Sequence, residues 1–298
     1  AHRGRALFAP RQAGLPFHNS ALASYLSLLL YRAEGRWDEA AIDLRRLRGA
    51  FETQPFIYPA APPDLSPMLQ PSTGARLNFI AFTGRGPVKR AQTLRITSGE
   101  NLLFITAETE DESGRLRLVG MESFFFDGIQ PGYNFKCQIP RMQLRPSSLA
   151  RIVVASDGAV LTELELLESL DRAAYASFAV RENLILAKTV IRAALKAITV
   201  AQSRRALEKS EDPTLRLFSL LGGLTAEVLV DASEQADLRL ARYFPGQAYV
   251  GEAEVPPGEH ELTINYYDHS GRLVRRETLP RQEYRDRPLN LLVSYNLR

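Results

Sequence analysis

The sequence predicts an α+β fold with an N-terminal helical hairpin, a β-rich middle, long central helices and a C-terminal antiparallel β-sheet that is sandwich-like. Apolar residues recur at every third or fourth position over residues 38–51, which is the period of an amphipathic helix. They alternate with mostly polar residues over 261–266 and 289–297, which predicts strands with one buried face. Short β-rich runs separated by Gly, Pro, Asn and Asp occupy residues 76–156.

Length and composition agree with this class of fold. The 298 residues suffice for about two domains. Hydrophobic residues make up 45% and charged residues 24%, as in ordinary globular proteins. We expect a helical arm at 1–55, a proline-rich linker at 56–75 and an α+β domain at 76–298. Within that domain, the β regions are expected at 76–157 and 246–298, and the helices at 162–240.

The predicted arm consists of helices over residues 19–30 and 38–51. Asn19 or Ser20 suits the N-cap of the first helix, and Gly35 suits the left-handed backbone of the turn that ends it. One face of the second helix is apolar, through Ala41, Leu44, Leu47 and Phe51.

Four residues of the arm fall at the spacing of the tetratricopeptide pattern: Tyr31, Gly35, Trp37 and Ala40. A single repeat of this kind buries its own apolar face poorly. We therefore expect the arm to pack on the rest of this chain or on another protein, and Tyr25, Tyr31 and Phe51 are the candidate protein-binding residues.

The residues after the arm predict a linker and then strands. Six prolines over 55–71 indicate an extended segment that is either a domain boundary or a wrap-around linker. Cys137, the single cysteine, is expected to be buried in a strand as a small apolar side chain. Six strands are predicted in this region, over residues 77–82, 92–96, 102–106, 115–119, 133–139 and 151–154.

The central helices are predicted over 162–210 and 212–230. Thr162 is the expected cap of the first, which is long enough that we expect a kink or break near 181–183. The second is apolar nearly all round and is expected in the middle of the molecule, with Gly222-Gly223 as a close crossing or a break. The two β regions join around it in one sheet or sandwich, or the C-terminal region forms a β-sandwich of its own.

Motifs for catalysis, cofactors and metals are absent from the sequence. The four histidines have no metal-ligand spacing, and Asp268-His269-Ser270 suits a turn better than a catalytic triad. The formal charge of +3 and scattered Arg pairs, such as Arg45-Arg46, do not indicate a nucleic-acid face. We therefore expect no enzymatic activity, no cofactor and no nucleic-acid partner.

Two further positions carry structural or binding hypotheses. Asp237 and Arg239 are expected to pair with backbone or with the region of Lys89, forming a structural junction; the alternative is an exposed pair of little energetic value. In the run Phe124-Phe125-Phe126, successive side chains point to opposite faces of a strand, so one face is available to a partner unless helix and sheet cover both.

The order of these segments resembles a poorly characterised bacterial family of predicted envelope lipoproteins with tetratricopeptide-like helices. The matching segments lie at residues 19–40, 86–89, 192–196, 234–239 and 255–258. The resemblance implies a periplasmic location or the periplasmic face of the outer membrane, with the cytoplasm as the alternative. It also implies an N-terminal lipidated cysteine, which this chain lacks, so membrane attachment is expected only through an anchor absent from the chain.

These observations favour a non-catalytic scaffold or adaptor of the bacterial cell envelope that binds another envelope protein. One alternative is a glycan-acting enzyme using carboxylates such as Glu108 and Asp111, which would have to oppose each other across a cleft about 5–10 Å wide. The other is a carrier of a small ligand or lipid, which predicts a large apolar pocket.

Overall fold

The computed structural model describes residues 19–72, 74–110, 115–125, 127, 131–132, 134–199, 237–241 and 243–297. The chain divides into two compact units. Unit 1 comprises Ala1–Gly14, Lys89–Met142 and Phe178–Leu240, and unit 2 comprises Leu15–Val88, Gln143–Ser177 and Ala241–Arg298. This division differs from the predicted one, because the expected arm and linker belong to the same unit as the C-terminal sheet.

Unit 2 begins with the predicted helical hairpin, formed by α1 (Ala21–Ala33) and α2 (Trp37–Thr53). Ser20 is the N-cap of α1, and its hydroxyl accepts a hydrogen bond from the amide of Ala23 at 3.0 Å. Gly35 has a φ of 74°, the left-handed conformation expected for the turn. The hairpin and its capping are therefore confirmed.

The expected linker is an ordered part of unit 2. Four of its side chains are buried in the same core as the two helices: Ile57, Tyr58, Leu65 and Met68. It contains one short 3-10 helix, η1 (Ser66–Leu69). Of the two expected roles, a domain boundary or a wrap-around segment, this packing fits the second, because the apolar residues between the prolines anchor the backbone on the core.

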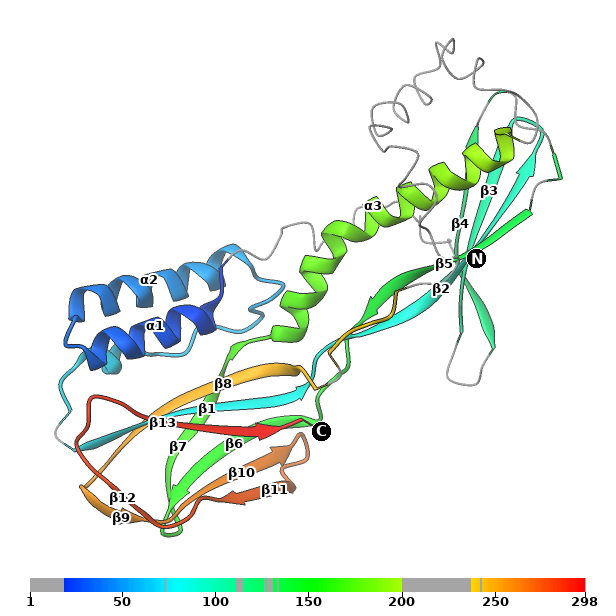
Figure 1. Cartoon of the computed structure of the whole chain (residues 1–298). Coiled ribbons are helices and arrows are strands. Elements are labelled where there is room, and N and C mark those ends of the chain that lie inside the picture. The colour runs from blue at the N-terminus through cyan, green and yellow to red at the C-terminus, as the bar shows by residue number, and fades with distance from the viewer. Residues whose placement is uncertain are drawn as a thin grey trace. The chain divides into compact units, whose positions relative to one another are not determined.

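Strands from both predicted β regions form one curled seven-stranded sheet in unit 2 (Figure 1). Its order is β11 (Leu273–Thr278), β10 (Leu262–Asp268), β6 (Leu149–Ser156), β7 (Ala159–Glu168), β8 (Pro245–Val255), β1 (Ala75–Arg85) and β13 (Asn290–Asn296). A separate two-stranded sheet pairs β9 (Gly258–His260) with β12 (Gln282–Tyr284). Strands β1 and β6 of the first β region thus share a sheet with strands of the second, whereas the helix expected between the two regions lies outside the described residues. The sheet is not wholly antiparallel, because β13 runs parallel to β1.

Two apolar cores hold unit 2 together. On one side of the sheet, α1 and α2 pack against it, with Tyr25, Leu28 and Leu47 meeting Ile80 and Val250 (Figure 1). The second core is formed mainly by strands, with Leu77, Phe79, Ile152, Ile264 and Tyr266 among its buried members. Each side of the sheet therefore contributes to an apolar core.

The last strand buries the face opposite to the predicted one. Leu291 and Val293 are exposed, whereas Ser294 and Asn296 are buried. Val293 is aligned with Ile80 of β1, on the side where the helices pack. The helices shield Ile80 and leave Val293 exposed, so the alternation was recognised correctly but the buried side was not.

The region predicted to start the central helix begins as a strand. Thr162 lies in β7, opposite Val154 of β6, so the prediction that it caps a helix is wrong. The helix α3 runs over Leu170–Thr199 without the interruption expected near residues 181–183. The glutamates at 163, 165 and 168 suggested a helix N-terminus, but they lie in β7. The predicted helix over 212–230, with Gly222-Gly223, lies outside the described residues.

Unit 1 contains a four-stranded antiparallel sheet packed on α3. Its order is β4 (Leu116–Phe125), β3 (Leu102–Glu110), β2 (Val88–Gly99) and β5 (Asn134–Gln143). Its core includes Leu94, Ile105 and Leu186 of α3, together with Cys137, which is buried as predicted. Arg141 of β5 also forms a 2.6 Å ion pair with the buried Glu182 of α3. All six strands predicted between residues 76 and 156 exist, but they divide between two sheets.

Candidate functional site

The strongest candidate site is an apolar surface on the four-stranded sheet, on the face away from α3. It is formed by Phe104, Leu116, Leu118, Met121 and Phe125, which we call the apolar strip. These side chains are 40%, 56%, 62%, 61% and 60% exposed, in that order. Soluble proteins rarely expose five large apolar side chains together on one face of a sheet.

A β-bulge in β4 brings the strip onto one face. Leu118 lies opposite Glu108 of β3, and Met121 lies opposite Thr106, with the register shifting between them. Residues 106 and 108 share a face of β3 because side chains alternate along a strand. Leu118 and Met121, three positions apart, therefore share that face too, which a regular strand would not allow.

Polar residues border the strip on the same face. Arg95 of β2 binds both carboxylate oxygens of Glu108, at 3.0 and 2.9 Å. Thr97 donates a hydrogen bond to Asn134 of β5 at 2.8 Å. An apolar centre with a polar border is the arrangement found in protein–protein interfaces.

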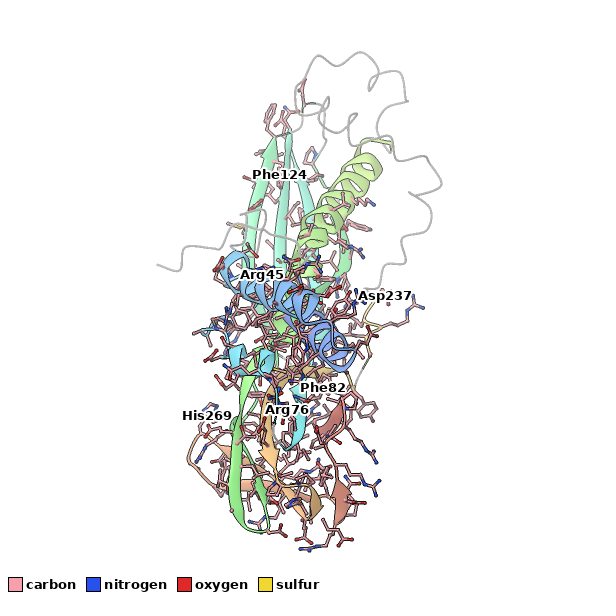
Figure 2. All side chains as sticks on the ribbon, turned by 90° about the vertical axis from the view of Figure 1, so that its left-hand side faces the viewer. Arg45, Arg76, Phe82, Phe124, Asp237 and His269 are labelled. Atoms are coloured by element: carbon pink, nitrogen blue, oxygen red, sulfur yellow. The ribbon has the colours of Figure 1, made fainter. Side chains whose placement is uncertain are left out.

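The phenylalanine run divides as its alternation predicted. Phe125 is exposed and belongs to the strip, whereas Phe124 is partly buried against the core that includes Cys137 (Figure 2). Phe126 lies outside the described residues. One of the two faces thus remains open.

The sequence did not reveal the other members of the strip. Leu116 and Leu118 alternate as in a strand, but Met121 is out of phase with them. Gly120 was the available signal, because glycine inside a strand pattern often marks a bulge. Counting across that bulge would have placed all three side chains on one face.

The predicted binding residues of the helical arm lie largely inside unit 2. Tyr25 is fully buried and Phe51 is 8% exposed, stacked on Tyr58 with ring centroids 4.5 Å apart. Tyr31 is partly buried against the same core. The guanidinium carbon of Arg36 lies over its ring, 4.4 Å from the ring centroid. The arm thus packs on the rest of its own chain, and Tyr25 and Phe51 are not available to a partner.

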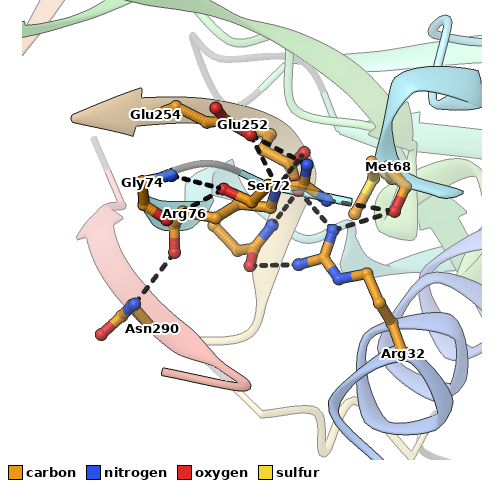
Figure 3. A network of polar contacts seen from close by, with 9 residues as sticks. Arg32, Met68, Ser72, Gly74, Arg76, Glu252, Glu254 and Asn290 are labelled. Atoms are coloured by element: carbon orange, nitrogen blue, oxygen red, sulfur yellow. Dashed lines mark hydrogen bonds and ion pairs between the residues drawn. The ribbon is translucent and has the colours of Figure 1, made fainter. Parts of the chain in front are cut away.

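A buried polar network holds the arm on the sheet (Figure 3). The guanidinium of Arg32 donates to Glu252 at 2.6 Å, to Asn78 at 2.7 Å and to the carbonyl of Met68 at 3.3 Å. Arg76 lies next to it and pairs with both Glu252 and Glu254. The charges are thus matched within the network, which indicates a structural role.

Burial, together with the nearby carboxylate of Glu252, raises the pKa of the Tyr25 hydroxyl. The hydroxyl therefore stays protonated and neutral at the edge of the network. A neutral hydroxyl suits its position in the core, because burial disfavours the charged form of the group.

A second buried carboxylate lies at the start of α1. One oxygen of Glu168, from the end of β7, accepts hydrogen bonds from the Ser20 hydroxyl and the Leu22 amide at 2.8 Å and from the Tyr58 hydroxyl at 3.2 Å. An anion is stabilised there by the unpaired amides and the dipole of the helix N-terminus. Burial, and then Glu168, raise the pKa of Tyr58.

Ser156, Asp157 and His260 bring the residue types of a catalytic triad together at the β6–β7 turn. The Ser156 hydroxyl and an Asp157 oxygen lie 3.2 and 3.4 Å from the same nitrogen of His260, Nδ1. The other nitrogen, Nε2, lies 2.8 Å from the carbonyl of Pro256. A triad needs serine and aspartate on opposite ring nitrogens, so this geometry does not provide the relay.

The electrostatics of this cluster also suit a structural role. Burial opposes the ionisation of Asp157, but hydrogen bonds from Ser156 and His260 and the charge of Arg281 keep its pKa below the usual value. Arg281 and Asp157 form a 2.8 Å ion pair. The cluster thereby ties the β6–β7 turn to the segment before β12.

The other triad-like sequence is a turn, as predicted. Asp268 accepts hydrogen bonds from the amide and hydroxyl of Ser270 and from the amide of Arg272. These bonds, led by that of the Ser270 hydroxyl, lower the pKa of Asp268 to about 2. The neighbouring His269 lies in this turn, between β10 and β11 (Figure 2).

The predicted junction residues contact one another in unit 1. Two nitrogens of the Arg239 side chain bind the carboxylate of Asp237 at 3.0 and 3.2 Å, and Lys89 donates to the Arg239 carbonyl at 3.1 Å. The Arg239 hydrogen bond, above all, lowers the pKa of Asp237 to about 2. The Arg239 side chain is 92% exposed, so the energetic importance of this junction stays a prediction.

Among the described residues, no group of three or more His, Cys, Asp or Glu side chains is arranged to hold a metal ion. None of the helices in the described part of the chain has the length and apolar character needed to cross a membrane. Comparison with protein families, with curated proteins and with solved structures finds nothing that matches this chain.

Proposed function

We propose that this chain is a non-catalytic scaffold or adaptor that binds another protein through the apolar strip. The observation that carries the proposal is the exposure of five large apolar side chains on one sheet face. Exposed patches of this kind commonly mark sites of protein interaction. The partner would cover the strip and contact the polar residues beside it, such as Arg95.

The proposal replaces the contact surface expected from the sequence. The helical arm supports unit 2 from within, because its apolar face meets Ile80 and Val250. Binding through Tyr25 and Phe51 would require the arm to leave the sheet and break the Arg32 network. Binding through the strip requires no such rearrangement.

One observation favours binding over glycan hydrolysis. Both oxygens of Glu108 are engaged by Arg95, which leaves this carboxylate poorly suited to act as an acid or base. Asp111, its suggested partner, lies outside the described residues. The proposed location, in the bacterial cell envelope, is supported by the sequence resemblance alone.

The test uses the tagged full chain as bait in an envelope extract of the native host. Met121→Lys places a charge in the middle of the strip, whereas Val160→Lys is the matched control at an exposed apolar position of unit 2. Circular dichroism establishes that both variants fold.

We expect one specific partner to be captured by the natural chain and by Val160→Lys, and purified partner to bind Met121→Lys at least about tenfold more weakly. This corresponds to about 1.4 kcal/mol, which is less than the value of one buried large apolar side chain. Equal binding by the folded Met121→Lys variant, or no specific partner for the natural chain, would contradict the proposal.

A further inference from the structure

The strand β4 forms an edge of the four-stranded sheet, and among the described strands it pairs only with β3. Natural proteins protect such edges with prolines, or with charges that repel an approaching strand. β4 contains no proline, and its two charged residues, Arg117 and Glu122, have opposite signs. Its sequence therefore lacks the like charges that would repel a second copy of itself.

The two charges are placed symmetrically about the middle of the strand. An antiparallel pairing of two β4 strands about an axis between Val119 and Gly120 sets Arg117 of each copy opposite Glu122 of the other. The same pairing sets Leu118 opposite Met121. Directly opposed residues in an antiparallel pair have neighbouring side chains, so opposite charges attract and apolar side chains meet.

The β-bulge makes this register consistent with the faces of the sheet. Leu118 and Met121 both lie on the face of the apolar strip. Arg117 and Glu122 lie opposite Thr109 and Ile105 of β3, on the other face. In a regular strand, residues three or five positions apart would point to opposite faces, and this self-pairing would bring unlike faces together.

From this complementarity we propose that the chain forms a two-fold symmetric dimer in which β4 pairs antiparallel with β4 of a second copy. The pairing continues the four-stranded sheet into one of eight strands and forms two Arg117–Glu122 pairs, one on each side of the axis. It leaves the strip faces of both copies open and adjoining, so it goes beyond the proposed protein binding and does not depend on it.

Charge reversal tests the register with purified full chain, using light scattering and sedimentation over a wide range of concentration. The natural chain is expected to dimerise. Arg117→Glu and Glu122→Arg each place like charges opposite one another twice, and each is expected to be monomeric on its own.

The sharpest outcome comes from combining the two changes. Mixing the two single variants is expected to restore a dimer containing one copy of each, because both cross-pairs are then complementary. The double variant Arg117→Glu/Glu122→Arg is expected to dimerise by itself. Arg151→Glu is the control: Arg151 forms an exposed 2.8 Å pair with Glu163 in unit 2, and its reversal should leave the dimer intact.

A cysteine variant keeps the proposal testable if charge reversal prevents folding. Val119→Cys, on a Cys137→Ala background, lies beside the proposed axis and is expected to form a disulfide-linked dimer under mild oxidation. Val160→Cys on the same background is the exposed control and should not cross-link efficiently.

A natural chain that is monomeric at all concentrations would overturn the proposal, as would folded single variants that still dimerise, or a mixture that stays monomeric. Because no extract is used, these results are separate from partner capture. A monomer that still captures a partner through Met121 would overturn the dimer and leave the proposed function standing.

Discussion

Removing the guanidinium of Arg32 is expected to destabilise unit 2 substantially. The Arg32 side chain is 4% exposed and donates three hydrogen bonds, including the 2.6 Å ion pair with Glu252. In Arg32→Met the part-buried carboxylate of Glu252, which is 15% exposed, loses this partner, and Asn78 loses a donor. Glu252 keeps Arg76 at 3.3 Å and the Asn78 amide at 2.6 Å, which limits the loss.

Breaking a buried ion pair from one side costs about 3–5 kcal/mol, and the remaining partners place this case near about 3 kcal/mol. At about 2–4 °C per kcal/mol for a unit of this size, the melting temperature should fall by roughly 6–12 °C. Urea unfolding followed by circular dichroism measures the loss in the free energy of unfolding. Arg36→Met is the matched control, because Arg36 is exposed and its loss should leave the unfolding midpoint unchanged.

A double-mutant cycle with Glu252→Gln separates charge from packing. Once Glu252 is neutral, Arg32→Met leaves no unpaired carboxylate, so the two changes should couple by about 1–2 kcal/mol. A loss below about 1 kcal/mol for Arg32→Met would refute the reasoning. Strict additivity of the two changes would refute the electrostatic part of it.

Two further predictions concern carboxylates of unit 2. Glu168→Ala should lower the free energy of unfolding by about 3 kcal/mol, because three donors lose a buried charged acceptor. Glu168→Gln should lower it by about 1–2 kcal/mol, because it removes only the charge at the helix N-terminus. Equal losses for the two variants in urea unfolding would contradict this. For Asp268, a pKa lowered from 3.8 to about 2 in the folded state means that ionisation stabilises the fold. This stabilisation is complete above the unfolded-state pKa and is lost as the pH falls through about 2. The difference in stability between the natural chain and Asp268→Asn should therefore shrink over that acidic range. A difference that stays constant in thermal unfolding from neutral to acidic pH would show that the Ser270 and Arg272 hydrogen bonds do not stabilise the ionised carboxylate.

The local parts of the fold were predictable where one short-range rule decided them. The roles of Ser20 and Gly35 follow from capping and turn chemistry. The alternation near Ile264 indicates a strand, whichever strand it pairs with. Strand existence was therefore predicted well for residues 76–156. The division of those strands between two sheets was not, because pairing joins segments that are distant in sequence.

The failures share a physical cause. Thr162 and its neighbouring glutamates suit the first turn of a helix, but pairing with β6 and β8 outweighed that local preference. Val293 belongs to the apolar face of its strand, yet the helices that would cover it extend over β1 instead. Burial on a sheet depends on which element lies above it, which no single strand encodes.

The candidate site was predictable only in part. The alternation around Phe125 indicated an open face, and the structure places that side chain in the apolar strip. The rest of the strip depended on the bulge at Val119, which shifts Met121 into phase with Leu118. The buried roles of Tyr25 and Phe51 could not be separated from binding roles, because an apolar helix face looks the same in sequence whether its own chain or another covers it.

The alternation of the two units along the chain has a consequence for the integrity of the molecule. After residue 15 the backbone passes between the units four times, at residues 88, 142, 177 and 240. Neither unit is a continuous stretch that a single cut could release. A protease that cleaves one connection would leave three others, so the nicked protein should remain one particle until a denaturant separates its fragments. Gene fusion or truncation at residue 142 would likewise divide both units rather than isolate either one.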